Sequence, residues 1–537
     1  MIGGRDLRLA GACAWGILML GVAVALTPHM ARAQSPRPTE ASGQPAETPA
    51  NPTSKESTGR PTRQHTQDEA EQIRRRAMKL EAEAVKAFLE KRFEDAEKAL
   101  REQLELQPDN YVILYNLACA RSALGDAKEG IDFLVRSVEG GFDDVRQLER
   151  DPSLALLRAD PQYKKMITVW PEVLKARRDA NVESVREFFR GRYEVLEDER
   201  LRLVYVSAVN EHSLTRAREE ISKIGEWASR EIFPGMLENP QAQLDPWVVV
   251  VLPTREDFVR WIVSRHGPDA VTGMSSIGGE YDHDTKILVA QDLGSSLRHE
   301  FFHVLHWRSC MRLGQRHPIW IQEGLCSIVE DYEPRGADIQ PVSSWRTNIV
   351  KRIERSGGYR GLEDLCNLDA NKFMGTRVLA MYARARAAFL YLSELGMLGR
   401  WYQNYVDDYH TDPSGLKTWE RTLEKPVKQI DLDMRGWIRR MEMVPEQIKS
   451  GMASLGVEVE AADGDGLRVA GLLEDHLRRG GPLIPGDIIV DIDGRATRDI
   501  AELVRVLGTY QPGTKVNVGV RRRSGVRTIE ITLVAKK

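Results

Sequence analysis

The sequence predicts a multidomain protein with a helical N-terminal part, a mixed α+β central part and a β-rich C-terminal module. Three observations predict this division. Helical periodicity with a 34-residue repeat begins near Ala70. Runs of β-branched residues separated by helical stretches follow between about residues 179 and 444. Short strands with glycine turns then occupy the chain from about Gly451. At 537 residues, the chain is long enough for three or four domains.

The N-terminus has the organisation of an export signal. Arg5 and Arg8 precede an apolar run over residues 9–26, and Ala31-Arg32-Ala33 offers a small-residue cleavage site. We therefore expect a signal peptide over residues 1–33 and an exported protein, periplasmic or extracellular. The alternative is an uncleaved anchor, because the apolar run is borderline for a membrane span. Contact with a membrane is expected only in that case.

Composition narrows the remaining classes. Residues 34–67 are rich in Pro, Ser, Thr, Gly and Gln and are expected to form a disordered linker. The net charge of -3 gives no reason to expect a nucleic-acid partner. Without the signal, four cysteines remain, and none has zinc-ribbon spacing. They could pair in three ways in an oxidising compartment, but we favour buried free thiols. They are Cys119, Cys310, Cys326 and Cys366.

Residues 68–178 carry the repeat. Ala84, Ala96 and Pro108 fall at three signature places of a tetratricopeptide repeat, and Ala118 and Gly125 fit the next copy. Small residues let two antiparallel helices approach closely. The segment therefore resembles a tetratricopeptide-like helical domain; the alternative is a generic helical hairpin.

A candidate metal site lies in the apolar helical run LRHEFFHVLHW, residues 297–307. An α-helix brings residues i and i+4 to one face, with Cβ atoms about 6 Å apart. His299 and His303 can therefore converge on one zinc ion. Glu300 lies on the adjoining side of the same turn, where a carboxylate can take a proton from a zinc-bound water. The alternative is a core helix that happens to carry histidines.

The stretch HPIWIQEGLC, residues 317–326, offers a third ligand. Pro318 suits the first turn of a helix, and Glu323 follows within two turns, placed to complete the three protein ligands that zinc needs. Upstream, we expect Ser295 or Ser296 to cap the helix that carries the two histidines.

HEFFH followed by WIQEGLC resembles the gluzincin metallopeptidases. The similarity is strongest to the peptidase MA-like family of exported bacterial proteins, in which a G-x-Y-D strand precedes the helix; here the stretch is GGEYDHDTKILVA, residues 278–290. The resemblance covers about residues 204–397. It implies an α+β zincin-type (thermolysin-like) metalloprotease domain, which we place at residues 179–444.

Carried over residue by residue, the resemblance makes His299, His303 and Glu323 the ligands of one Zn2+ per chain and Glu300 the general base. The implied reaction is attack of zinc-activated water on a peptide carbonyl, without a covalent intermediate. Because the ligand histidines must be neutral and Glu300 ionised, we expect activity to fall in acid.

The gluzincin aminopeptidase pattern Y-x-K-G-x-x-x-x-x-Y-L is matched in part by YARARAAFLYL, residues 382–392. The resemblance makes Tyr382 the hydroxyl that stabilises the oxyanion. Arg384 and Ala385 replace the Lys-Gly pair, so a helix-packing tyrosine is the alternative. His410 is the second candidate for this role.

Other positions depart from the gluzincin pattern. Cys326 stands where the family usually has alanine, and Ser327 stands where a carboxylate often orients a histidine ligand. His306 lies about 10 Å along the helix axis from His299, too far to share its ion, and is interpreted as a cleft-lining or packing residue. His317 is interpreted as a turn residue.

The run from residue 481 to 522 resembles a PDZ domain, with GPLIPGDIIVDIDG at its core. We expect this domain over residues 449–537. In PDZ domains an extended peptide adds as a strand beside one helix, and loop amides hold its terminal carboxylate. The alternative is a closed PDZ domain with a structural role alone.

By comparison with PDZ domains of secreted bacterial proteases, the peptide-binding residues are Leu455, Gly456 and Val457. The helix over residues 500–507 is expected to form the other wall of the groove.

Together these resemblances imply an exported zinc-dependent peptidase acting on protein or peptide substrates, with PDZ and tetratricopeptide-like modules that recruit polypeptide. Two other classes stay open: a catalytically inactive peptide-binding scaffold, and a zinc hydrolase of a small amide.

Overall fold

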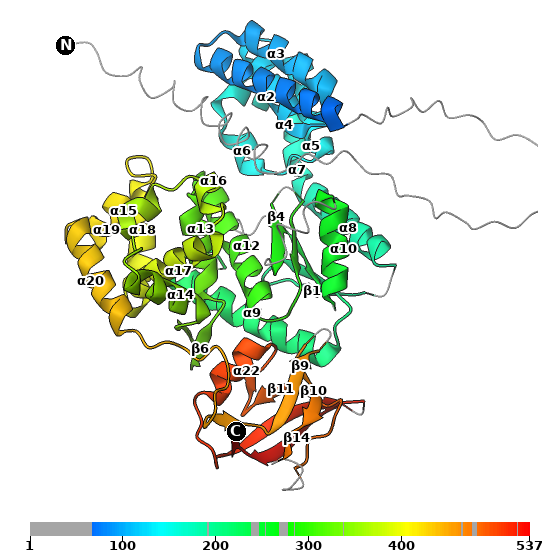
Figure 1. The fold of residues 1–537 in the computed structure, drawn as a ribbon. Helices are drawn as coiled ribbons and strands as arrows, with labels where there is room; N and C mark the ends of the chain where they lie inside the picture. The colour runs from blue at the N-terminus through cyan, green and yellow to red at the C-terminus, as the bar shows by residue number, and fades with distance from the viewer. Residues whose placement is uncertain are drawn as a thin grey trace, which may run out of the picture. The chain divides into compact units, whose positions relative to one another are not determined.

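The computed structural model describes residues 67–190, 193–237, 246–252, 254–267, 278–283, 285–336, 338–462, 465–474, 481–523 and 525–537 (Figure 1). The expected signal peptide lies outside these ranges, as does the expected linker up to residue 66. Within them, no helix is long and apolar enough to cross a membrane. The chain divides into two compact units, Met1–Trp170 and Pro171–Lys537.

The first unit is helical, as the sequence predicts. Its main helices are α2 (Gln67–Leu89), α3 (Phe93–Leu106), α4 (Tyr111–Ala123) and α5 (Ala127–Gly140). Ala84, Ala96 and Ala118, the small residues of the repeat pattern, are all buried. Gly125 adopts a φ of 84° between α4 and α5, a left-handed conformation that glycine accepts without strain. The tetratricopeptide assignment itself stays a proposal.

Shorter helices follow α5, namely α6 (Val145–Arg150), η1 (Pro152–Leu154), η2 (Leu157–Ala159) and α7 (Pro161–Thr168). Buried Asp151 ties them to α4, because its carboxylate accepts a hydrogen bond from the Tyr115 hydroxyl at 2.7 Å and caps η1 through the Ser153 amide.

A five-stranded sheet organises the first half of the second unit. Its order is β1-β2-β3-β5-β4. The strands are β1 (Glu194–Asp198), β2 (Leu203–Ser207), β3 (Trp247–Val251), β4 (Gly279–Asp282) and β5 (Ile287–Ala290). The three central strands run parallel, and both edge strands are antiparallel to their neighbours. Every residue of β2, β3 and β5 is buried, as expected for strands covered on both faces.

Alternate residues of these strands belong to two hydrophobic cores. Tyr205, Val249 and Leu288 pack in a core shared with helices α9 and α12, whereas Val206 and Val250 pack in a second core with α8 and α10. These helices are α8 (Trp170–Phe188), α9 (Glu211–Glu231), α10 (Arg255–His266) and α12 (Ser295–Leu313). The sheet therefore lies between two helical layers (Figure 1).

A helical body follows α12. It comprises α13 (Ile319–Ile328), α14 (Trp345–Arg355), α15 (Gly361–Cys366), α16 (Ala370–Phe373), α17 (Val378–Glu394), α18 (Leu398–Asp408), α19 (Leu416–Leu423) and α20 (Val427–Arg440). A two-stranded hairpin of β6 (Tyr332–Arg335) and β7 (Asp338–Pro341) follows α13.

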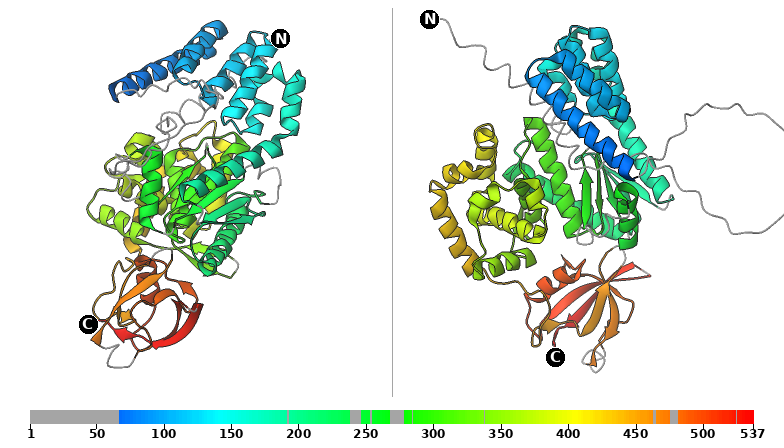
Figure 2. Two further views of the ribbon diagram at one scale, coloured as in Figure 1. Left: turned by 90° about the vertical axis from the view of Figure 1, so that its right-hand side faces the viewer. Right: turned by 45° about the horizontal axis from the view of Figure 1, so that its top comes forward.

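The last part of the chain is β-rich, as predicted (Figure 2). Its main sheet has the order β14-β13-β11-β10-β9, so β9 is an edge strand, and β12 pairs with β11. Helix α22 spans Ile500–Leu507, the predicted range, and Leu503, Val506 and Leu507 pack into the core of this sheet. The strands are β8 (Ala453–Ser454), β9 (Val457–Ala461), β10 (Leu467–Leu472), β11 (Ile488–Ile492), β12 (Arg495–Ala496), β13 (Lys515–Arg522), β14 (Gly525–Thr532) and β15 (Val534–Ala535).

Candidate metal centre

Three candidate ligands converge between α12 and α13. His299 Nε2 lies 3.2 Å from both His303 Nε2 and Glu323 Oε2, and His303 Nε2 lies 3.5 Å from Glu323 Oε2. Ligand atoms bound to one tetrahedral zinc at about 2.0–2.1 Å stand roughly 3.3 Å apart from one another. The three atoms therefore have the spacing that one such cation requires. We call these residues the metal-ligand group.

Local structure explains how the two helices bring these side chains together. His299 and His303 share one face of α12, and α13 begins directly after Pro318. Gly324 lets α13 lie close to α17, because a Cβ at this position would be 2.6 Å from the Phe389 ring and 3.0 Å from the Ala385 carbonyl oxygen. This packing fixes Glu323 opposite the two histidines.

The prediction that Ser295 or Ser296 caps α12 is wrong. Neither Ser295 nor Ser296 caps the helix. Asp292 does so, its Oδ1 accepting hydrogen bonds from the amides of Gly294 at 2.8 Å and Ser296 at 3.2 Å. The carboxylate reaches both amides from the preceding turn, and the Ser296 hydroxyl donates to its second oxygen instead.

Glu300, the candidate base, is buried beside the ligands. Edge strand β4 runs along it, and Gly279 has no room for a side chain, since a Cβ there would be 2.5 Å from Glu300 Cγ. Burial raises the pKa of Glu300 to about 8, and the nearby Glu323 adds to the shift. A carboxylate with this pKa can both accept and return a proton near neutral pH.

Glu330 is the functional residue that sequence reasoning missed. Its Oε1 lies 2.9 Å from His299 Nδ1, and Arg346 donates to both of its carboxylate oxygens, at 2.6 and 2.9 Å. Burial alone would raise the pKa of Glu330, but Arg346 and His299 lower it to about 2, so it is a carboxylate. Glu330 thus orients His299, the role that Ser327 cannot fill, since the Ser327 hydroxyl donates to the Glu323 carbonyl oxygen.

No sequence spacing pointed to Glu330, because it lies two residues beyond Ile328, the last residue of α13, and its position depends on how that helix ends.

The metal-ligand group combines a buried carboxylate with buried imidazoles whose protonation it influences. Burial would lower the pKa of His299, but hydrogen bonds from its ring to Glu323 and Glu330 raise it to about 10. For Glu323, burial opposes ionisation, yet the two histidines hold its pKa well below the usual range. The Tyr281 ring of β4 stacks on His303 at 4.2 Å and restricts that imidazole.

Tyr382 lies beside the metal-ligand group. Its ring is 6.2 Å from that of His299, and the Arg346 guanidinium is 5.2 Å from its centre. Burial, followed by the Glu323 carboxylate, raises the pKa of Tyr382 far above its usual value, so the hydroxyl keeps its proton. His410, the second candidate, is exposed after α18 and packs against Tyr409.

A second buried cluster, His306, Cys310 and His317, lies further along α12. His306 Nε2 is 2.8 Å from His317 Nδ1, and His317 Nε2 is 3.0 Å from Gln315 Oε1. The Gln315 amide nitrogen donates to the Val406 carbonyl at 2.8 Å, so Oε1 must accept from His317. His317 Nδ1 therefore accepts from His306. We call the hydrogen-bonded pair His306 and His317 the imidazole chain.

All four cysteines of the described residues are buried thiols, as predicted. Of the expected peptide-binding residues, Leu455 and Gly456 lie directly before edge strand β9, and Val457 is the first residue of that strand. Gly456 has a φ of 73°, and its amide donates to the Ser454 hydroxyl at 3.1 Å.

Comparison with known proteins confirms one domain. The model of the PDZ domain family matches residues 453–533. A probable periplasmic serine endoprotease, DegP-like, from Pseudomonas fulva (strain 12-X) is 32% identical over 100 residues, which are 18% of this chain and 19% of that protein. The similarity to this relative thus spans about a fifth of either chain.

Two solved structures were also compared. An HtrA-type protease, AlgW with a decapeptide, is 24% identical, with a TM-score of 0.15, over 21% of this chain and 35% of that chain. An aminopeptidase N family protein from Idiomarina loihiensis is 15% identical, with a TM-score of 0.29, over 64% of this chain and 67% of that chain.

Proposed function

We propose that this chain is an exported zinc-dependent peptidase that hydrolyses peptide bonds of protein or peptide substrates. His299, His303 and Glu323 would hold the ion. The observation that carries the proposal is their mutual spacing of 3.2–3.5 Å, with Glu300 on the same helix turn and buried beside them. Two imidazoles and one carboxylate form a donor set that suits zinc.

Bound zinc would polarise the scissile carbonyl and make the attacking water acidic. Glu300 would take the proton from that water and return it to the leaving amine. Tyr382, protonated and beside the metal-ligand group, would donate a hydrogen bond to the oxyanion as it develops. Glu330 would keep His299 in the tautomer whose Nε2 faces the ion.

The other modules fit polypeptide substrates. The PDZ domain would bind an extended segment or a peptide C-terminus at Leu455 and Gly456 and along edge strand β9, which begins at Val457. The helical hairpins of the first unit would form a second, tetratricopeptide-like contact surface. The periplasmic DegP-like relative supports export of this chain.

The test is hydrolysis of a fluorescently labelled unfolded protein, such as casein, by the chain of residues 34–537 and by its Glu300→Gln variant. We expect the variant to lose about 10²- to 10⁴-fold in kcat while binding one equivalent of zinc like the parent. Exposed Glu363→Gln, on α15, is the matched control and should keep full activity. Equal hydrolysis by Glu300→Gln and the parent would overturn the proposal.

A further inference from the structure

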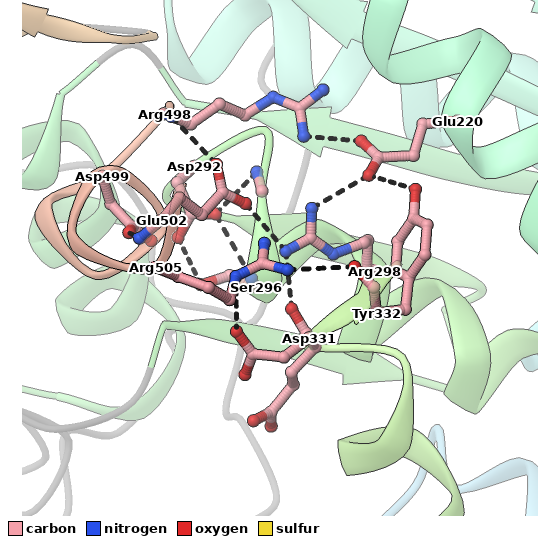
Figure 3. Close-up of polar contacts among 12 residues, drawn as sticks. Glu220, Asp292, Ser296, Arg298, Asp331, Tyr332, Arg498, Asp499, Glu502 and Arg505 are labelled. Carbon is pink, nitrogen blue, oxygen red and sulfur yellow. Dashed lines mark hydrogen bonds and ion pairs between the residues drawn. The ribbon is translucent and has the colours of Figure 1, made fainter. Parts of the chain in front are cut away.

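The N-terminal turn of α12 is held by a buried charge network (Figure 3). Arg298 directly precedes His299, and only 3% of its side chain is exposed. One of its terminal nitrogens donates to Glu220 Oε1 of α9 at 3.0 Å. The other donates to the Glu330 carbonyl oxygen at 2.6 Å and to Glu502 Oε1 at 3.0 Å. Arg298 therefore joins the metal-bearing helix to three other segments.

One of these contacts leads directly to the metal-ligand group. Arg298 holds the backbone of Glu330, and the carboxylate of Glu330 faces His299 Nδ1. A displaced Arg298 would therefore move Glu330, which orients His299, and also the turn of α12 that carries His299.

The PDZ domain supplies the other half of the network. Glu502 is in the first turn of α22, and its side chain is 4% exposed; its Oε2 accepts from the Arg498 amide at 2.9 Å. The Arg498 guanidinium donates to Glu220 Oε2 at 2.5 Å. Asp499 caps α22 through the Glu502 amide at 2.7 Å. Two buried pairs of opposite charge, Arg298 with Glu502 and Arg498 with Glu220, thus join the two domains.

Such charges are costly to separate. A buried ion whose partner is removed is left without compensation, whereas a complete network of alternating charges can be tolerated in the interior. The two arginines lower the pKa of Glu220 to about 2 although burial opposes its ionisation, so its negative charge is maintained. The network therefore connects the PDZ domain to α9 and α12.

Helix α22 serves both domains. Leu503, Val506 and Leu507 pack into the PDZ core. Glu502 and Arg505 lie on another face, and Arg505 donates to the Tyr332 carbonyl oxygen at 3.0 Å. The helix expected to line the peptide groove is thus the same helix that contacts the metal-bearing domain.

We propose that Glu502 and Arg498 of the PDZ domain are positioning residues for the metal centre, acting through Arg298 on the first turn of α12 and on Glu330. The inference rests on the proposed function, because it takes the metal-ligand group to bind zinc. The docked PDZ domain then contributes to metal affinity in addition to recruiting polypeptide. By reciprocity, the bound metal strengthens PDZ docking by the same factor.

The test measures zinc affinity of the chain of residues 34–537 by competition with a chromophoric chelator. We expect Glu502→Gln to weaken zinc binding about tenfold, the lower end of the effect of losing an outer partner of a metal ligand. The control is Arg495→Gln, also on the PDZ side of the interface, whose partner Glu333 lies on β6. This control should change the affinity less than about twofold.

Two further readouts separate positioning from general stability. The visible spectrum of the cobalt-loaded protein should shift in Glu502→Gln and stay unchanged in Arg495→Gln, since it reports ligand geometry. In a double-mutant cycle, Glu502→Gln should reduce zinc affinity less in the Arg298→Gln background than in the parent, because Glu502 acts on the metal centre through Arg298. Should Glu502→Gln fail to fold, Arg498→Lys, which keeps the charge, should weaken zinc about threefold.

The outcomes are distinct. Zinc binding in Glu502→Gln and Arg498→Lys equal to that of the parent, with unchanged cobalt spectra, would overturn the positioning role and leave the proposed function intact. Failure of the parent to bind zinc would overturn the proposed function first.

Discussion

Helix α12 carries two buried histidine clusters, and their geometries differ in the spacing of the facing atoms and in the presence of a carboxylate. In the metal-ligand group the facing atoms stand 3.2–3.5 Å apart, and a carboxylate is among them. In the imidazole chain His306 and His317 are 2.8 Å apart, which is a hydrogen bond and too short for two ligands on a tetrahedral zinc. Buried histidines alone do not define a metal site.

The two clusters also differ in charge, and this difference again favours a cation at the metal-ligand group. The metal-ligand group contains the Glu323 carboxylate, the Glu330 carboxylate lies 2.9 Å from His299 Nδ1, and Glu300 is buried beside them. Burial lowers the pKa of His317 to about 3, and that of His306 falls as well, so the imidazole chain is neutral and already satisfied. In the first environment a cation would replace the hydrogen bond between His299 and Glu323 and gain the carboxylate as a ligand. In the second it would break the bond between His306 and His317, and no carboxylate belongs to that cluster.

The largest expected effect comes from removing one ligand. Structural zinc sites with four ligands bind with about 10–16 kcal/mol, so one ligand contributes about 3–4 kcal/mol. His303→Asn should therefore weaken zinc about 10²- to 10³-fold. His317→Asn should leave zinc affinity within about threefold while lowering the free energy of unfolding by about 1–3 kcal/mol. Chelator competition and urea unfolding measure the two quantities; equal zinc loss in both variants would contradict the distinction.

A tyrosine lies against each cluster, which gives a matched pair. Tyr382→Phe should lower kcat about 10²-fold with little change in KM, since the hydroxyl would act only on charge that develops during reaction. Tyr402 packs on His306 and His317 and bonds to Ser309, so Tyr402→Phe should leave kcat unchanged. If Tyr382→Phe has the kinetics of the parent, Tyr382 is a helix-packing residue.

Glu330→Gln tests what orients His299. We expect zinc affinity to fall about 10- to 100-fold, because a neutral amide polarises the imidazole less than a carboxylate does. Glu354 on α14 is also a buried glutamate with arginine partners, Arg435 and Arg439, and Glu354→Gln should not alter zinc affinity. The same affinity in Glu330→Gln as in the parent would show that His299 is oriented by packing alone.

The pH dependence of zinc binding gives a smaller effect. Without a cation, the pKa of His299 is about 10, so at pH 7 zinc must displace its proton. Affinity should rise about tenfold per pH unit for each displaced proton as pH increases. The imidazole chain adds nothing to this pH dependence, because its histidines stay neutral over the measured range. Chelator competition between pH 6.5 and 8.5 measures this; a flat profile would mean that His299 is already neutral.

Much of the architecture could be predicted from sequence because it depends on local pattern. The three central strands of the sheet, helix α22 and the PDZ domain follow from periodicity and from one specific run of residues. The i, i+4 spacing of His299 and His303 likewise decides which face of α12 they share.

Other features depend on tertiary contacts that no pattern reveals. Glu330 follows the last residue of α13 by two, so its contact with His299 depends on how that helix ends. The partnership of Arg298 with Glu502 joins residues 204 positions apart. Asp292, rather than a serine, caps α12 because the turn before the helix aims its carboxylate at two amides.

The most direct test of the central claim is the number of zinc ions bound per chain of residues 34–537, measured by elemental analysis after dialysis against a small excess of zinc. We predict one ion per chain, retained in His317→Asn and lost in Glu323→Ala. Two ions per chain would show that the imidazole chain also binds metal. One ion retained in Glu323→Ala and lost in His317→Asn would place the metal in the imidazole chain and contradict its assignment to His299, His303 and Glu323.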